Sequence, residues 1–345
     1  SVHPPHRVCR LRRLKTVDIS NFNTQAVKNM DSMFGYCTNL ATIYVGENFV
    51  TTNAISSTNM FYDCQLLKGA IAYNANKTNR IFANYKTGYF TKLVGKNGDE
   101  KIGAVGEILT AENLTLNDDK DFVAYELFTA TTATYSREMK TGTTWATLCL
   151  PFEVLPENQN FRAFKLLSAD EGTNTIELEE ITTSIAVGTP IIIKMNEGQT
   201  ALGFSVADKM IEKDAKIAAT ADGRYQLVGL YATKMFDKTT DNNCYIVKGN
   251  KLMNPAKILS GTSTEAVGSK PFRAYMVDKS SSASGAKMFS ISENGSNPTG
   301  IDQLTDTLND SNAIYYDLQG HRLSQPQKGI NILKVGNKTM KVIIK

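Results

Sequence analysis

Hydrophobic positions in the first quarter of the chain recur in a fixed order. The pattern Leu-x-x-U-x-U, where U is apolar or small, appears three times at nearly equal spacing, as "LKTVDI", "LATIYV" and "LKGAIA". A second motif, Met-Phe followed by two residues and then Cys, appears twice with the same spacing. The repeated positions are Leu14, Leu40 and Leu67 for the first motif, and Met33, Phe34, Cys37, Met60, Phe61 and Cys64 for the second. A period of roughly 20–29 residues with this strand pattern predicts a short leucine-rich-repeat solenoid.

Stacking explains why the same residues return. One coil cannot bury its own apolar face, whereas stacked coils place each Leu over the previous Leu and each Cys over the previous Cys. We therefore expect all nine residues inside one core, with Met and Cys as adaptable fillers. The positions one period before Met33 and Phe34 hold His6 and Arg7. The array is thus incomplete at its N-terminal edge, through an abnormal cap or because the chain starts within a longer array. The next domain must help cover the open end.

Short apolar runs separated by turn residues follow from residue 93 to residue 293. Helical periodicity is hard to find there, and many closely spaced strands predict an antiparallel, sandwich-like β-module. The runs that we interpret as strands are "DFVAYELF", "ATYSREM", "TTWATLCLPFEV", "FRAFKLL", "NTIELEEI", "TPIIIKM", "RYQLVGL", "NCYIVKG" and "PFRAYMV".

The last part of the chain predicts a separate small β-unit. Residues 294–311 are polar and read as a linker. Apolar runs in 312–345 flank Gly336-Asn337, a two-residue hairpin signal. The expected organisation is therefore a mainly β chain with repeats and a closing segment in 1–92, a β-rich module in 93–293, a linker, and a β-unit in 312–345.

Charge and composition exclude several classes of protein. The net charge of +4 comes from five basic residues among the first fifteen, which hold no acid, so the rest of the chain carries a net charge of −1. Basic charge confined to a terminal segment argues against a nucleic-acid-binding face. No apolar run approaches the roughly 20 residues of a membrane helix, and no signal-peptide core is visible. We expect a mature or truncated product.

Cys149 is the first candidate for chemistry. It follows the only Trp in "TTWATLCLPFEV", a run expected to be a central strand with Trp145, Thr147 and Cys149 on one face. Ala146, Leu148 and Leu150 would lie on the other face. A nucleophilic Cys needs a His partner, and the His residues are all in terminal regions, at His3, His6 and His321. A buried core cysteine is the favoured interpretation, and five scattered cysteines without a CxxC pair predict no zinc site and no dense disulfide framework.

Two groups of acids are further candidates. Glu177 and Glu179 could form a glycosidase pair, but their alternation with Ile176 and Leu178 is typical of a half-solvated strand. Asp118, Asp119 and Asp121 lack the ligand spacing of a calcium loop. We favour a polar turn, with a weak calcium site as the alternative.

Three segments resemble known families. "VDISNFNTQAVKNMDSMFGYCTNLATIYV" resembles the BspA-type leucine-rich repeats of bacterial cell-surface proteins, and "KGAIAYNANKTNRIFANYKTGYFTKL" resembles the segment that closes such arrays. The resemblance covers residues 14–92 and implies surface exposure and, as in some members, adhesion to host proteins. "TGTTWATLCLPFEV" with "PFRAYM" resembles a module found beneath these repeats in Bacteroidetes surface proteins, from which no catalytic residue can be carried over.

The tail carries the third resemblance. "YDLQGHRL", "QKGINILKV" and "KVIIK" are similar to the C-terminal sorting domains of the type IX (Por) secretion system, with Gly320, Gly329 and Lys345 in the matching segments. This resemblance implies export across the outer membrane to the extracellular surface. The alternative is a capping β-unit that carries no export signal.

These features favour a non-enzymatic, surface-exposed or secreted binding protein that presents its repeats to another protein. The alternatives are a glycan-binding accessory module of a surface complex and, less favoured, a hydrolase. We expect no cofactor, no metal and no nucleic-acid partner; the partner would be a host or surface protein, or a glycan. The sequence does not set the oligomeric state.

Overall fold

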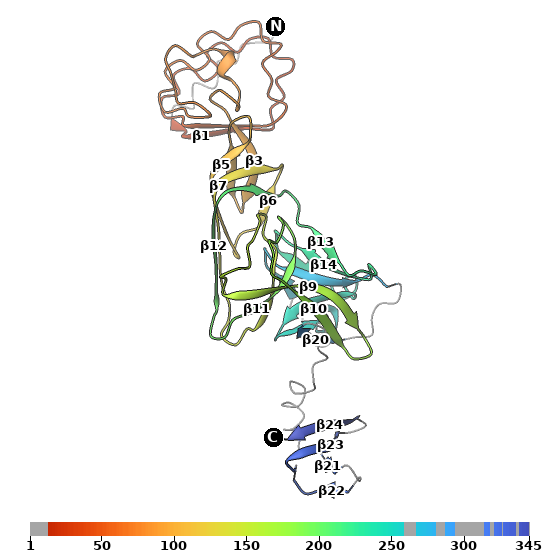
Figure 1. The fold of residues 1–345 in the computed structure, drawn as a ribbon. Helices are drawn as coiled ribbons and strands as arrows, with labels where there is room; N and C mark the ends of the chain where they lie inside the picture. The colour runs from red at the N-terminus through yellow and green to blue at the C-terminus, as the bar shows by residue number, and fades with distance from the viewer. Residues whose placement is uncertain are drawn as a thin grey trace.

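The computed structural model describes residues 13–258, 267–280, 287–293, 314–317, 321–325, 327–335 and 338–344. Within these ranges the protein is mainly β, as the sequence predicts, and its helical elements are the short helix α1 (Pro255–Ile258) and the 3-10 turn η2 (Arg80–Phe82). Figure 1 shows the repeat coils above the β-rich middle module. The two meet at strands β3 (Thr91–Asn97), β5 (Thr110–Asn117), β6 (Phe122–Ala124) and β7 (Phe128–Glu138).

The repeat unit stacks its coils through hydrogen bonds on two sides. Strands β1 (Thr16–Ile19) and β2 (Thr42–Val45) pair in parallel with Thr16 beside Thr42, which is the offset that separates Leu14 from Leu40 in the sequence. On the turn side, backbone bonds of 2.9 Å join Met30 to Ser56 and Phe34 to Met60. The rings of Phe34 and Phe61 stack in between, with centroids 5.6 Å apart.

Most of the repeated positions lie in this core, and Leu14 does not. Seven are at most 1% exposed, namely Phe34, Cys37, Leu40, Met60, Phe61, Cys64 and Leu67. Met33 is partly buried against them. Leu14 is 43% exposed, because it precedes β1 in the first described coil and has a described neighbouring coil on one side only. Met30, which the repeat pattern does not single out, is fully buried instead.

The third repeat copy, "LKGAIA", begins as expected but forms no strand. Lys68 donates its backbone N–H to Ala41, 3.0 Å away, and the chain then turns at Gly69. A Cβ at Gly69 would lie 2.4 Å from the backbone of Tyr89, so only glycine fits this turn. The place beside β2 is taken by β3 (Thr91–Asn97), which pairs in parallel with β2.

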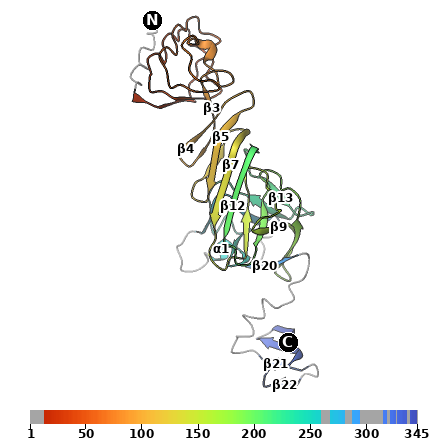
Figure 2. The same ribbon diagram turned by 60° about the vertical axis from the view of Figure 1, so that its left-hand side comes forward.

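Strand β3 joins the repeat unit to the middle module. It also pairs antiparallel with β4 (Glu100–Ala104) and β6 (Phe122–Ala124), so one five-stranded sheet runs through both parts (Figure 2). The boundary expected between residues 92 and 93 falls inside this strand. Sequence patterns mark where a repeat ends, but they do not show that its last strand is shared with the next domain.

Lys92, on β3, lies at this junction with its side chain only 3% exposed. Its ammonium contacts the carboxylate of Glu47, after β2, and lies 3.3 Å from that of Glu126, in the β6–β7 connection. These contacts are ion pairs by distance, without hydrogen-bond geometry at Nζ. They connect the repeat coil to the middle module electrostatically.

Two sheets form the middle module. One is three-stranded, with β7 (Phe128–Glu138) between β5 (Thr110–Asn117) and β12 (Ala201–Ile211). The other is a curled half-barrel with the order β13-β14-β19-β16-β17-β20-β10-β9-β11-β8. Its strands are β8 (Trp145–Leu148), β9 (Phe161–Asp170), β10 (Thr175–Ile181), β11 (Ile191–Met195), β13 (Ile217–Ala219), β14 (Tyr225–Gly229), β16 (Cys244–Lys248), β17 (Lys251–Met253), β19 (Ala274–Asp278) and β20 (Met288–Glu293). Strands β15 (Lys234–Phe236) and β18 (Val267–Ser269) form a separate pair.

Strand β8 is not central but stands at the end of the sheet order. Its free edge approaches β19 through Thr147, whose hydroxyl donates to the carbonyl of Ala274 over 3.0 Å and accepts from its N–H over 2.9 Å. Trp145 faces the core inside the curl, while Ala146 and Leu148 face the core shared with the three-stranded sheet. At this edge, the hydroxyl of Thr147 therefore replaces a neighbouring backbone as the hydrogen-bond partner of β19.

The C-terminal strands pair only with one another in the described residues. They are β21 (Ile314–Tyr316), β22 (Arg322–Leu323), β23 (Gly329–Val335) and β24 (Lys338–Ile344). Val335 pairs with Lys338, so two residues connect β23 and β24, as the hairpin signal predicts. Gly329 begins β23, whereas Gly320, Lys345 and the expected linker 294–311 lie outside the described residues. Among the described helices, none is long and apolar enough to cross a membrane.

Candidate functional site

The turn side of the repeat unit exposes a pair of tyrosines. Tyr36 is 47% and Tyr62 is 45% exposed, and their ring centroids are 5.2 Å apart. The N–H of Tyr36 donates to the carbonyl of Tyr62 over 2.7 Å, so the backbone itself sets the spacing of the two rings. Tyr36 adopts a φ of 62°, and Asp63, at the equivalent position of the next coil, has a φ of 58°. The same left-handed turn thus recurs in both coils.

Further side chains stiffen these coils. Asp31 accepts a hydrogen bond from the N–H of Thr58 over 2.6 Å and a second one from the hydroxyl of Ser56. The hydroxyl of Thr24 donates to Val50 and accepts from it, at 2.6 and 2.7 Å. Large apolar side chains also stay in water on this unit, with Ile55 83% and Ile81 69% exposed. Among these exposed groups, tyrosine is of a type that is enriched in protein–protein interfaces.

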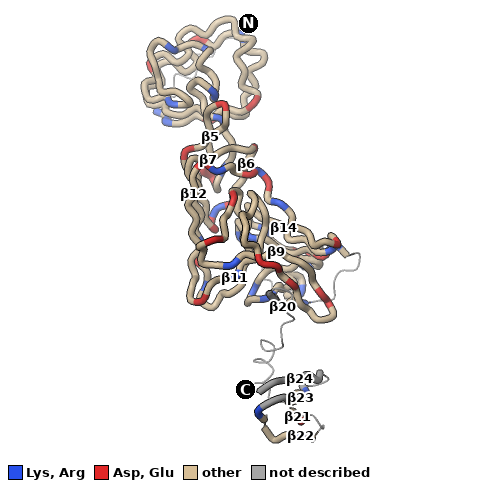
Figure 3. Tube along the Cα trace, viewed as in Figure 1, with Lys and Arg blue, Asp and Glu red and all other residues tan. Residues whose placement is uncertain are grey.

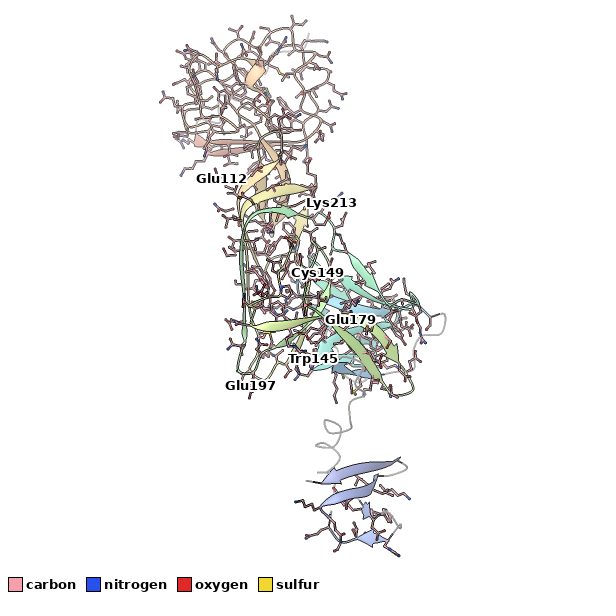
Figure 4. The ribbon with its side chains drawn as sticks, viewed as in Figure 1. Glu112, Trp145, Cys149, Glu179, Glu197 and Lys213 are labelled. Atoms are coloured by element: carbon pink, nitrogen blue, oxygen red, sulfur yellow. The ribbon has the colours of Figure 1, made fainter. Side chains whose placement is uncertain are left out.

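The middle module contains a groove of about 580 Å³. It lies between the end of β7, the 139–145 loop, the turn that joins β16 to β17, and the approach to β19. Trp145, labelled in Figure 4, lies on its wall together with Asn250. Asn250 fixes that wall, because its Oδ1 accepts hydrogen bonds from the N–H groups of Thr144 and Trp145 at 2.8 and 3.0 Å.

Three charged side chains lie at the base of the groove. Arg273 binds both oxygens of Asp118, over 2.8 and 2.5 Å, and the hydroxyl of Tyr135 donates to Asp118 over 2.7 Å. Arg137 donates from Nη1 to the carbonyl of Thr147 over 2.9 Å. Its Nε is 3.9 Å from Asp118 and has no hydrogen-bond partner among the described residues.

The pKa values at this cluster follow from burial and charge. Burial, followed by the nearby charge of Arg273, lowers the pKa of Arg137 to about 10. Burial would raise the pKa of Asp118, but its hydrogen bond from Arg273 and the charges of both arginines outweigh this, and the pKa is lowered. Both groups are therefore charged at neutral pH.

The three acids considered for calcium have separate partners. Asp118 is held by Arg273, as above, and Asp119 forms an exposed ion pair with Lys270 over 3.2 Å. Asp121 accepts two hydrogen bonds of 2.8 Å from Thr233. Within the described ranges, no group of three or more His, Cys, Asp or Glu side chains could hold a metal ion.

Cys149 lies in the core shared with the three-stranded sheet, apart from Trp145. The expectation that the two share a face is wrong, because β8 ends at Leu148 and the strand alternation stops there. Its thiol donates to the carbonyl of Gly188 over 3.2 Å, and burial raises its pKa to about 12. Such a thiol is a packing group, not a nucleophile.

Glu177 and Glu179 also have local partners. Glu177 accepts a hydrogen bond from Ser168 over 3.1 Å, and Glu179 forms an ion pair with Lys165 over 3.0 Å. Ile176 and Leu178, beside them on the strand, are fully buried. This is the half-solvated strand that the alternation predicts.

Sequence reasoning missed Arg137 and Arg273. Arg273 lies before the start of β19, outside any strand alternation. A signal existed for Arg137, because it stands two positions after Tyr135 within a run that reads as a strand. An arginine at an inward-facing strand position needs a buried partner. The partner, Asp118, is far away in sequence and lies in a segment that the sequence predicts to be a polar turn.

The architecture is that of a mainly β protein with a stacked-coil repeat unit. Residues 11–89 match the family model described as "Mycoplasma protein of unknown function, DUF285". The match covers the repeat unit and less than half of the chain, so it bears on the repeats alone. No curated protein and no solved structure matched the chain.

Proposed function

We propose that this protein is a non-enzymatic binding protein of the cell-surface or secreted type, which uses its repeat unit to recognise another protein. The observation that carries the proposal is the pair Tyr36–Tyr62, two large exposed rings held 5.2 Å apart on stiff, hydrogen-bonded coils. Tyrosine provides a large contact area at low entropic cost, and it is enriched among the residues that dominate interface energies.

Other features support a binding role. The repeat segment resembles BspA-like surface proteins, and its family match extends over 11–89. The resemblance of the tail to type IX sorting domains supports export to the outer-membrane surface. Both basic and acidic residues occur along the repeat unit and the middle module (Figure 3), as suits recognition of a protein rather than a polyanion.

The test is binding of the full chain to a panel of purified extracellular host and bacterial surface proteins, measured by biolayer interferometry. The double variant Tyr36→Ser/Tyr62→Ser should weaken binding to any bound panel member by at least about tenfold, as expected for removal of two anchoring rings. Tyr125→Ser is the matched control, because Tyr125 is 46% exposed but lies in the β6–β7 connection.

Two outcomes contradict the proposal. One is binding of no panel member, or binding that the double variant and the control retain equally. The other is hydrolysis of glycan or peptide substrates that is lost on substitution of Glu177 or Cys149. A glycan-binding role is the second candidate, and the groove in the middle module favours it.

A further inference from the structure

The groove holds an excess of buried positive charge. The side chains of Arg137 and Arg273 are 8% and 14% exposed, and the one carboxylate between them, Asp118, is 15% exposed. Arg273 takes both carboxylate oxygens. Two guanidinium groups against one carboxylate leave one positive charge without a partner, an arrangement that destabilises a protein unless something compensates it.

The neighbouring charges do not remove this excess. Glu138 also lines the groove, but it is exposed and its carboxylate accepts a hydrogen bond from the hydroxyl of Thr200 over 3.4 Å. Lys270 also lines the groove and is offset by its ion pair with Asp119, and Lys140 is exposed to solvent, so the excess of charge inside the groove does not come from either lysine. The buried charge without a full partner is therefore that of Arg137.

Arg137 itself is incompletely satisfied. Its Nη1 donates to Thr147, whereas its Nε is buried without a hydrogen-bond partner among the described residues. A buried donor left unsatisfied is unusual and calls for an explanation such as a missing ligand. Arg137 is one of the residues that line the groove, so a ligand in the groove would lie against this side chain.

The rest of the groove suits a small hydroxylated molecule. Its volume of about 580 Å³ lies within the usual range for small-ligand sites. The hydroxyl-bearing residues Thr141, Thr143 and Ser269 are part of its lining, and a hydroxyl can both donate and accept hydrogen bonds. Glycines at 142, 249 and 268 let a ligand approach the backbone closely.

We propose that this groove binds an acidic sugar, a small hydroxylated ligand with one carboxylate, such as a hexuronate. The carboxylate pairs with the guanidinium of Arg137, whose planar fork matches it, and the sugar hydroxyls bond to the threonine and serine side chains. A single negative charge equals the excess at the base of the groove. The proposal does not depend on the function proposed for the repeat unit.

Isothermal titration of the full chain with four probes tests this. Glucuronate should bind at least about tenfold more tightly than glucose, which lacks the charge, and than acetate, which lacks the hydroxyls. It should also bind more tightly than sulfate, which has a different shape and charge. Equal binding of glucose, equal or tighter binding of sulfate, or no binding of glucuronate each overturns the proposal.

Variants of Arg137 separate a binding role from a structural one. Arg137→Met should abolish glucuronate binding without lowering the melting temperature of the ligand-free protein, because it removes an uncompensated buried charge. Arg137→Lys keeps the charge but not the fork and should bind at least about tenfold more weakly. Arg13→Met, an exposed arginine on the repeat unit, is the matched control and should bind as the unchanged protein does. Undiminished glucuronate binding in both Arg137 variants overturns the proposal.

Discussion

At the scale of single residues, Asp118 balances buried positive charge inside the middle module. It is the carboxylate shared by two buried arginines, Arg273 and Arg137. Asp118→Asn should lower the free energy of unfolding at pH 7 by about 3–5 kcal/mol, because it leaves both guanidinium groups uncompensated. Urea denaturation followed by tryptophan fluorescence measures this, since Trp145 lines the same groove.

The neighbouring acid and the pH dependence are the controls for that prediction. Asp119→Asn should change stability by less than about 0.5 kcal/mol, because Asp119 is 81% exposed. The pKa of Asp118 is lowered in the folded state, so its contribution is present above its unfolded pKa of about 4 and is lost as pH falls through the lower, folded value. The difference between Asp118→Asn and the unchanged protein should shrink over that acidic interval. A difference that grows on acidification would contradict the assignment.

At this scale, burial can be predicted from the sequence where the packing repeats from coil to coil. Contacts between residues that lie far apart in the sequence cannot be predicted in this way. Leu40 and Phe61 are fully buried because a coil lies on each side of them. Leu14 carries the same motif yet is exposed. The motif alone could not predict this, because it does not show whether a neighbouring coil is present. Arg137 and Asp118 come together only through the pairing of strands that the local pattern does not specify.

At the scale of elements, Gly69 decides that the third repeat copy turns away and leaves its place to β3. An added Cβ would meet the backbone at Tyr89, Gly88 and Phe90 at 2.4 to 2.7 Å. Gly69→Ala should therefore lower the free energy of unfolding by about 1–3 kcal/mol, as overpacking does. Gly203→Ala on β12, where nothing lies within 4 Å of the added carbon, should be neutral or slightly stabilising. Equal losses in thermal unfolding for both variants would show that the close approach at Gly69 can relax.

Strands with strong alternation of apolar and polar residues can be predicted from the sequence, but their positions in the sheet cannot. The nine apolar runs expected as strands all contain strand residues, from β6 in "DFVAYELF" to β19 in "PFRAYMV". The long strand β12 was missed because its alternation of buried and exposed residues stops after Val206. Strand β8 was expected to be central because both its faces are apolar, but the curl of the sheet covers both faces of an end strand equally well.

At the scale of the whole molecule, the two ends of the chain should differ in their effect on the middle module. The repeat unit shares β3 with it and is held by the buried Lys92, with its contacts to Glu47 and Glu126. Strands β21–β24 pair only with one another among the described residues.

Deletion of residues 1–90 should lower the melting temperature of the middle module by several degrees, because β3 loses β2 and Lys92 loses Glu47. Deletion of residues 312–345 should leave it unchanged. Differential scanning calorimetry of both truncated chains and the full chain measures this. A fall in melting temperature after the C-terminal deletion would instead mean that this small unit is a cap for the middle module.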